Sequence, residues 1–224
     1  MNRPLVLDID GTMSRPDRSI EGRVIDAVRD WNAPVVIATG KAFPYPVALC
    51  DFIGIETRVI AENGGIVCTD EAVQVNGDGE AARRAARDLE DAGYDLGWDD
   101  ADLINRWRET EVAVDREVPR EAVDEHAARY GLEVVDSGYA FHVKSGDVDK
   151  GLGLETVAAL MDQSPADFAA VGDSENDVET FAVAGVSYAV ANADERARAA
   201  ADHVTDGSYA DGLLEAMRAI ADGN

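Results

Sequence analysis

The stretch Leu5-Val6-Leu7-Asp8-Ile9-Asp10-Gly11-Thr12 decides how this chain folds. It begins with three apolar residues, a run typical of a strand that is buried on both faces of a parallel sheet. Two aspartates and a glycine follow at once, and such residues end a strand and turn the chain. Because ligands bind beyond the carboxyl ends of parallel strands, the stretch predicts an acidic site at the end of the first strand.

The same alternation of apolar strands and helices continues through the first third of the chain and returns near its end. Further strands are expected at 34–38, 59–61, 168–171 and 187–190, and helices at 20–31, 47–53, 152–161, 178–184, 193–201 and 210–220. Strands that alternate with helices favour a parallel sheet covered on both faces. We therefore predict an α/β fold with a doubly wound, Rossmann-like parallel sheet.

The segment between these two parts has a different pattern of apolar and polar residues. Helices are expected at 80–92 and 120–130, and short strands at 111–115, 133–135 and 139–144, where Ser137-Gly138 is typical of a hairpin turn. This pattern predicts a smaller inserted α/β domain. We assign residues 1–76 and 148–224 to the core and residues 77–147 to the insert.

Composition excludes several classes of protein. The 224 residues carry a formal net charge of −25, which argues against binding to nucleic-acid phosphates. No apolar stretch is long enough for a membrane span, the first residues do not fit a signal peptide, and two cysteines cannot build a disulfide framework. We expect a soluble, cytoplasmic protein.

The acidic side chains outnumber the basic ones by 45 to 20, and only three of the basic residues are lysines. Excess carboxylates repel one another, and molar salt screens that repulsion. The balance favours a halophilic protein that works at molar salt, whereas an ordinary acidic cytosolic protein is the alternative.

Polar residues at or just past the predicted strand ends should meet at one edge of the sheet; they are Asp8, Asp10, Thr39, Asn63, Asp173 and Asp177. Near the end of a strand, Asp8 and Asp10 leave the backbone on the same side. Two carboxylates held so close repel unless a cation lies between them or one is protonated. A hard cation such as Mg²⁺ takes oxygen ligands of this kind together with phosphate oxygens.

At this point the sequence resembles the haloacid dehalogenase-like phosphatases. Asp8–Thr12 is similar to their first motif, Ala38–Lys41 to the second, Lys150 to the third and Gly172–Asp177 to the fourth. Glu62-Asn63-Gly64-Gly65 resembles a segment of the subgroup whose α/β cap lies between the second and third motifs, where the insert lies here.

The resemblance implies a role for each acidic residue. Asp8 would attack phosphorus and form an aspartyl-phosphate, and Asp10 would protonate the leaving group and then activate water. Magnesium would be held by Asp8, by the main-chain carbonyl of Asp10, by Asp173, and by Asp177 either directly or through water.

It also implies a phosphate site made of Thr39, Gly40 and Lys150. Asn63 and Asn176 are assigned to the same site, although each could instead serve a turn or a helix cap. Lys41 stands where the family pattern more often has arginine, and its role is open between a surface ion pair and a phosphate contact.

Four other residues invite a functional interpretation. His142 lies beside the third motif and could face the substrate, although a structural role is favoured. His126 is expected to be solvated on a polar helix, and Cys50 and Cys68 are expected to be small apolar core residues.

These residues predict a magnesium-dependent phosphomonoesterase acting on a small phosphorylated substrate, as a monomer or homodimer. Length and cap position resemble the archaeal members that hydrolyse 2-phosphoglycolate. A sugar-phosphate phosphatase or phosphomutase relative is the first alternative. A receiver-like signalling module, which also carries carboxylates at strand ends, is the alternative from another class.

Overall fold

The computed structural model describes residues 2–223 and contains an eight-stranded sheet in the order β11-β10-β9-β1-β2-β3-β4-β5. Its strands are β1 (Leu5–Asp8), β2 (Val35–Ala38), β3 (Arg58–Ala61), β4 (Ile66–Thr69), β5 (Val73–Val75), β9 (Ala169–Gly172), β10 (Val186–Ala189) and β11 (His203–Val204). The six strands from β11 to β3 are parallel, as expected, with β1 between β2 and β9.

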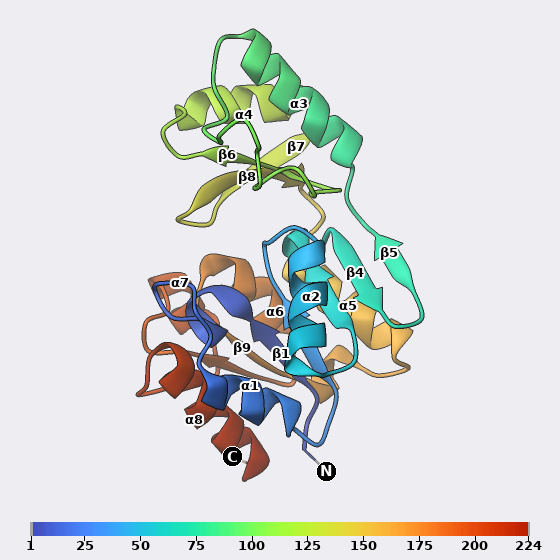
Figure 1. Cartoon of the computed structure of the whole chain (residues 1–224), viewed down its shortest axis with the longest axis vertical. Helices are drawn as coiled ribbons and strands as arrows, with labels where there is room; N and C mark the ends of the chain where they lie inside the picture. Colours follow the sequence, from blue (N-terminus) through green and yellow to red (C-terminus); the bar gives the residue numbers. More distant parts are fainter. Residues whose placement is uncertain (1, 224) are drawn as a thin grey trace.

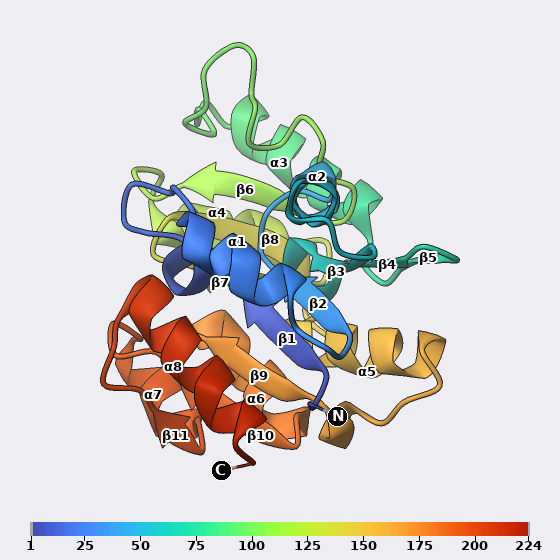
Figure 2. The ribbon, with the colours of Figure 1, turned by 60° about the horizontal axis from the view of Figure 1, so that its bottom comes forward.

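Helices cover both faces of this sheet (Figures 1 and 2). One face packs on α1 (Gly22–Arg29), α2 (Pro44–Ile53) and α8 (Tyr209–Ala221), and the other on α5 (Lys150–Leu160), α6 (Val178–Val183) and α7 (Glu195–Ala200). Successive side chains of β1 alternate between the two layers: Leu5 and Leu7 enter the first, and Val6 enters the second. Burial on both faces explains why the strand has no polar position before Asp8.

The sheet departs from the predicted all-parallel arrangement at one edge. β4 runs antiparallel to β3, and β5 antiparallel to β4. The reversal occurs at the short turn η2 (Glu62–Gly64), where Glu62, Asn63 and Gly64 have φ values of 51°, 53° and 96°. These left-handed conformations fold the chain straight back, so the apolar run Ile66–Thr69 pairs with the strand it has just left.

A second sheet, with the order β6-β8-β7, lies between α3 and α5 in the sequence. Its strands are β6 (Val112–Asp115), β7 (Leu132–Asp136) and β8 (Ala140–Ser145), all antiparallel, and its helices are α3 (Gly79–Asp91) and α4 (Arg120–Ala128). These elements enclose an apolar cluster of their own. We call this part the cap; its boundaries at 76/77 and 147/148 remain a prediction.

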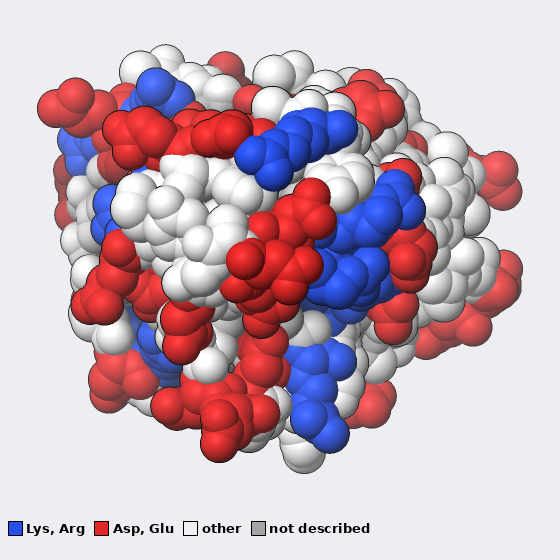
Figure 3. Space-filling model, turned by 90° about the horizontal axis from the view of Figure 1, so that it is seen from above, with Lys and Arg blue, Asp and Glu red and all other residues white. Residues whose placement is uncertain are grey.

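The cap lies over one end of the core, and both chain termini lie at the opposite end (Figure 1). Seen from the cap end, acidic side chains cover much of the surface and basic side chains form a smaller strip among them (Figure 3). Within residues 2–223, none of the helices has the length and apolar content needed to cross a membrane.

Candidate active site

Asp8 ends β1 and is almost fully buried. Lys150, at the start of α5, is completely buried and donates from Nζ to Asp8 Oδ1 at 2.7 Å and to Asp177 Oδ1 at 2.7 Å. Burial alone would lower the pKa of Lys150, but the carboxylates of Asp177 and Asp8 raise it above its ordinary value. The lysine is therefore a fixed positive charge beside Asp8.

The fourth motif contributes two more carboxylates beside Asp8. Asp177 Oδ2 accepts hydrogen bonds from the main-chain nitrogens of Asp173 and Ser174 at 2.9 and 3.1 Å. Burial, together with the charge of Asp177, raises the pKa of Asp173 to about 7. Burial also raises the pKa of Asp8 well above its ordinary value, because Lys150 does not offset both burial and the neighbouring acids.

The carboxylates of Asp8, Asp173 and Asp177 form a group that could hold a metal ion, with ligand atoms within 4.8 Å of one another. Asp8 Oδ2 is buried and has no hydrogen-bond partner among residues 2–223. A buried, unpaired oxygen in a group of carboxylates is an environment that a bound cation would stabilise, and an all-oxygen site suits a hard divalent one. The side chain of Asp10 lies outside this group.

The turn after β1 places Asp10 at the mouth of the site. Gly11 has a φ of 85°, and a Cβ atom there would lie 2.0 Å from Asp173 Oδ2, so only glycine fits. Asp10 is partly exposed and forms an ion pair with Lys41 Nζ at 2.8 Å. Of the two roles considered for Lys41, this geometry favours the ion pair over the phosphate contact.

The loop after β2 carries the other expected phosphate-binding groups. Thr39 is fully buried, and its Oγ1 accepts from the main-chain nitrogen of Lys41 at 3.1 Å. Gly40 follows, and its carbonyl accepts from Arg108 Nη1 of the cap at 2.9 Å. A cap residue therefore contacts the loop of the second motif.

The fold brings together Asn63, which lies in η2, and Asn176, which lies in the 3₁₀ turn Glu175–Asp177 directly before α6. Asn176 Nδ2 donates to Asn63 Oδ1 at 3.0 Å, and Asn176 Oδ1 accepts from Lys150 Nζ at 3.1 Å. Asn176 therefore contacts both Lys150 and Asn63, and the role of the two asparagines as direct phosphate ligands stays a prediction.

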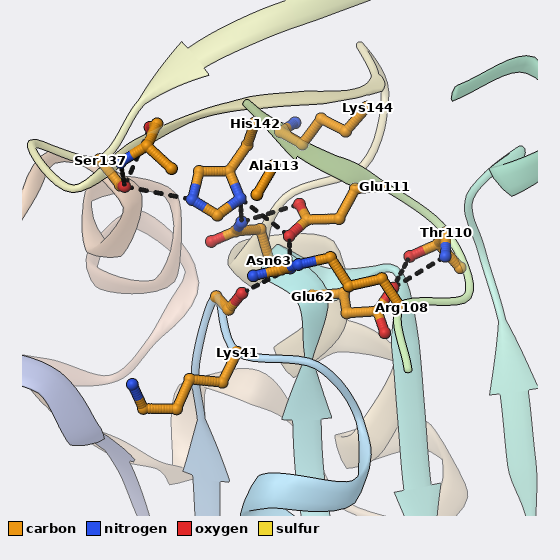
Figure 4. A network of polar contacts seen from close by, with 12 residues as sticks. Lys41, Glu62, Asn63, Arg108, Thr110, Glu111, Ala113, Ser137, His142 and Lys144 are labelled. Carbon is orange, nitrogen blue, oxygen red and sulfur yellow. Dashed lines mark hydrogen bonds and ion pairs between the residues drawn. The ribbon is translucent and has the colours of Figure 1, made fainter. Parts of the chain in front are cut away.

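A buried cap cluster above these residues was not predicted. Glu111 is fully buried, pairs with Arg108, and accepts from His142 Nδ1 at 2.8 Å (Figure 4). His142 Nε2 lies 3.1 Å from Ser137 Oγ. The only sequence signal for Glu111 was a charged residue placed directly before the apolar strand Val112–Asp115, and Arg108 lies in a segment with no regular pattern.

Glu62 joins the cap to the core and was also missed as a functional residue. Its buried carboxylate accepts from the main-chain nitrogens of Glu109 and Thr110 and from Thr110 Oγ1, at 2.8–3.0 Å. Burial raises the pKa of Glu62, although these hydrogen bonds act in the opposite direction. The motif segment that reverses the sheet thus also anchors the cap.

Core and cap enclose a cavity of about 380 Å³ between them. Asp8, Asp10 and Asp173 line it from the core, and Arg108 and His142 line it from the cap. His142 was considered as a substrate-facing residue, and the structure places it both in this lining and in the cap cluster. The cavity is small and mixes cations with the three core acids.

Two expectations for other residues can now be assessed. His126 is buried rather than solvated, and its Nδ1 lies 2.7 Å from the carbonyl of Ala122, one turn earlier in the same helix. The prediction for this residue was wrong. Cys50 and Cys68 are buried free thiols, as expected.

A sequence profile of the haloacid dehalogenase-like hydrolases matches residues 5–95 and 105–217. The chain belongs to this family. The matched residues include Asp8, Lys150 and the acidic segment before α6, which together supply the buried charges of the site.

Named relatives of this hydrolase cover almost its whole length. A phosphoglycolate phosphatase of Natronomonas pharaonis is 58% identical over 97% of both chains. A phosphoglycolate phosphatase of Haloarcula marismortui is 51% identical over 98% of this chain and 97% of its own. These relatives come from halophilic organisms, which is consistent with the salt adaptation that the composition predicts.

Solved structures have the same architecture. A crystal structure of a Thermoplasma acidophilum protein aligns with a TM-score of 0.86 at 25% identity, over 99% of both chains. A haloacid dehalogenase-like hydrolase of Bacteroides thetaiotaomicron aligns with a TM-score of 0.78 at 18% identity, over 98% of this chain and 100% of its own, which shows the shared fold.

Proposed function

We propose that this hydrolase is a magnesium-dependent phosphomonoesterase that converts 2-phosphoglycolate to glycolate and phosphate. The observation that carries the proposal is the environment of Asp8, which is a buried carboxylate with one oxygen on Lys150 and the other unpaired. The unpaired oxygen is free to bind a cation or to attack phosphorus. The names of relatives that are more than 50% identical supply the choice of substrate.

Asp8 is the proposed nucleophile. Its attack on phosphorus would break the bond to the substrate oxygen and leave an aspartyl-phosphate, which water then hydrolyses. Lys150 is within hydrogen-bond distance of Asp8 and would offset the negative charge that meets there when the phosphoryl group arrives. Thr39 and the main chain of Gly40 are the proposed contacts of the phosphoryl oxygens.

Asp10 is the proposed general acid and base. Its carboxyl group is partly exposed at the cavity, two residues beyond Asp8, where it can reach a leaving oxygen and then a water molecule. The ion pair with Lys41 holds this carboxyl in the cavity. Protonation of the leaving oxygen by Asp10 would release glycolate with a neutral hydroxyl group in place of the phosphate ester.

Magnesium fits the acidic group of the site. Asp8, Asp173 and the main-chain carbonyl of Asp10 would hold it, with Asp177 bound directly or through water. Asp177 already accepts from Lys150 and two main-chain nitrogens, which favours the indirect contact. When bound, the ion neutralises carboxylate and phosphate charge.

The cavity supports a small, strongly anionic substrate. In a chain with a net charge of −25, four basic residues line this one cavity: Arg15, Arg18, Lys41 and Arg108. 2-Phosphoglycolate carries a carboxylate besides its phosphate, and arginine recognises carboxylates well. We also propose that the enzyme works in the cytoplasm, as a monomer or homodimer.

Phosphate release in 2 M KCl with Mg²⁺ tests the function, with 2-phosphoglycolate, a panel of sugar phosphates and an aryl phosphate as substrates. We expect kcat/KM for 2-phosphoglycolate to exceed the others by about a hundredfold, equivalent to about 2.7 kcal/mol of transition-state preference. Turnover of a sugar phosphate at a similar rate would contradict the substrate. Turnover that needs a bisphosphate activator would favour a phosphomutase.

A further inference from the structure

A chain of hydrogen-bonded side chains connects the cap to the nucleophile. Asn63 Nδ2 donates to Glu111 Oε2 at 2.9 Å, and Asn176 Nδ2 donates to Asn63 Oδ1 at 3.0 Å. Lys150 Nζ then donates to Asn176 Oδ1 at 3.1 Å and to Asp8 Oδ1 at 2.7 Å. We call Glu111, Asn63, Asn176 and Lys150 the relay. Its cap end, with Asn63 against Glu111, is drawn in Figure 4.

The charged ends of the relay dictate the direction of each of its bonds. An ammonium group only donates hydrogen bonds and an ionised carboxylate only accepts them. The amide oxygen of Asn176 must therefore face Lys150, which turns its nitrogen toward Asn63 and the nitrogen of Asn63 toward Glu111. Ser174 Oγ donates to the same oxygen of Asn176 at 2.8 Å and reinforces this orientation. Neither asparagine can flip without losing bonds at both of its ends.

The cap keeps Glu111 ionised and in place. Burial alone would raise the pKa of Glu111, but the charges of His142 and Arg108 lower it to about 2. Arg108 also donates to the carbonyl of Gly40, so the group that holds Glu111 is docked on the core. The acceptor at the cap end of the relay is therefore a permanent anion at a fixed position.

We infer that Glu111 is a positioning residue, which orients the Lys150 ammonium against Asp8 through Asn63 and Asn176 when the cap is docked. Three of the four relay members belong to the core, and only Glu111 comes from the cap. Without Glu111, the nitrogen of Asn63 has no carboxylate to bind and keeps only a 3.4 Å contact with His142 Nδ1, so the orientation of both amides is less strictly dictated at that end. Alignment of the lysine is thus coupled to the docking of the cap on the core.

Steady-state kinetics of relay variants test this inference, and this arm rests on the proposed phosphatase function. Glu111→Ala removes the cap acceptor, and Asn63→Gly removes the middle of the relay with a residue that tolerates the positive φ of 53°. We expect each variant to lower kcat about tenfold with KM changed less than about twofold, because small displacements near the reacting groups are costly. Since both act through one relay, the double variant should also lose about tenfold.

Thr110→Val is the matched control. Thr110 Oγ1 makes a cap–core hydrogen bond of 2.8 Å to Glu62 in the same interface, but it is not a member of the relay. We expect this variant to lower Tm while kcat stays within about twofold of the wild type. A double relay variant that loses about a hundredfold, or a Thr110→Val variant that loses kcat as much as the relay variants, would overturn the inference.

A second measurement needs no turnover and separates this inference from the choice of substrate. The chain has only three lysines, Lys41, Lys144 and Lys150, so ¹⁵N-lysine labelling gives three ammonium signals at most. The buried Lys150 signal can be assigned with Lys41→Arg and Lys144→Arg variants. We expect Glu111→Ala to shift or broaden that signal and Thr110→Val to leave it unchanged; an unchanged signal in Glu111→Ala would overturn the inference even if the enzyme is an active phosphatase.

Discussion

The core and the cap each bury a cluster of charge beside the cavity, and the two clusters differ in their balance. In the core, the carboxylates of Asp8 and Asp177 pair with the single ammonium of Lys150, and Asp173 belongs to the same acidic group. Burial, together with the excess of negative charge, raises the pKa of Asp8 and of Asp173. This cluster lacks positive charge, which is the condition that a bound cation would relieve.

The cap cluster has the opposite balance. Glu111 is one carboxylate between Arg108 and His142, and its pKa is lowered to about 2 although its side chain is fully buried. Its polar atoms are satisfied without any added group. The comparison teaches that a buried cluster with an excess of one charge indicates a ligand site. A buried cluster whose charges and hydrogen bonds are balanced instead stabilises the structure around that site.

The largest effect should come from exchanging one carboxylate for its amide in each cluster. Asp8→Asn should lower kcat by about 10³-fold or more, because it removes the nucleophile. In metal-free protein the same change should not lower Tm, because it relieves repulsion among three acids. Phosphate release and thermal melts in 2 M KCl with EDTA measure the two effects.

Glu111→Gln is the counterpart in the cap and should lower Tm, because it leaves the buried guanidinium of Arg108 without its carboxylate. If Asp8→Asn lowers Tm as much as Glu111→Gln does, the contrast between the clusters is wrong. Residual activity above a few per cent in Asp8→Asn would remove Asp8 from its proposed role.

A smaller effect is expected from pH in the metal-free protein. The pKa of Asp173 is raised to about 7 in the folded chain, so between about pH 4 and 7 the folded state binds more protons than the unfolded state. Stability from this group should therefore be highest at low pH and decline as pH rises toward 7, by on the order of 2 kcal/mol between pH 5 and 7.

Thermal melts of wild type and of Asp173→Asn across this pH range, with EDTA in 2 M KCl, measure that contribution as the difference between the two curves. The amide variant should show a flatter pH dependence, since it cannot be ionised. Saturating Mg²⁺ should also flatten the wild-type curve, because the ion favours the ionised carboxylate. Parallel curves for wild type and Asp173→Asn would contradict the raised pKa.

The smallest effect should come from salt, and it should not distinguish the two clusters. Raising KCl from 0.1 to 3 M should increase Tm by several degrees, on the order of 1 kcal/mol, because it screens repulsion among exposed carboxylates. The increase should be the same in wild type and Glu111→Gln, since buried pairs are screened much less. A Tm that stays flat or falls with salt would contradict the halophilic interpretation.

Much of the core site could be predicted because its residues follow short strands that are apolar on both faces. β1 ends at Asp8, and β9 ends one residue before Asp173, so both carboxylates were expected at the same edge of the sheet. The antiparallel strands β4 and β5 were missed, because the reversal depends on three consecutive left-handed residues in η2. The periodicity of apolar residues in the sequence does not reveal such a turn.

The cap cluster could not be predicted for a related reason. Arg108, Glu111 and His142 lie in a loop, before one strand and within another, and nothing local relates them. His126 was misjudged in the same way, because the number of polar neighbours on its helix says little about which side faces the cap sheet.

By itself, the sequence determined the layered α/β core, the acidic edge where its strands end, the salt-adapted surface and the motifs that identify the family. Those properties follow from local order, since the period of apolar residues sets each element and the residue after a strand lies at a sheet edge. Only the tertiary structure decided which distant side chains meet: Glu111 with Asn63, Asn176 with Lys150, and Arg108 with Gly40. Hydrogen bonds and ion pairs act over about 3 Å, and only the folded chain brings these residues to that distance.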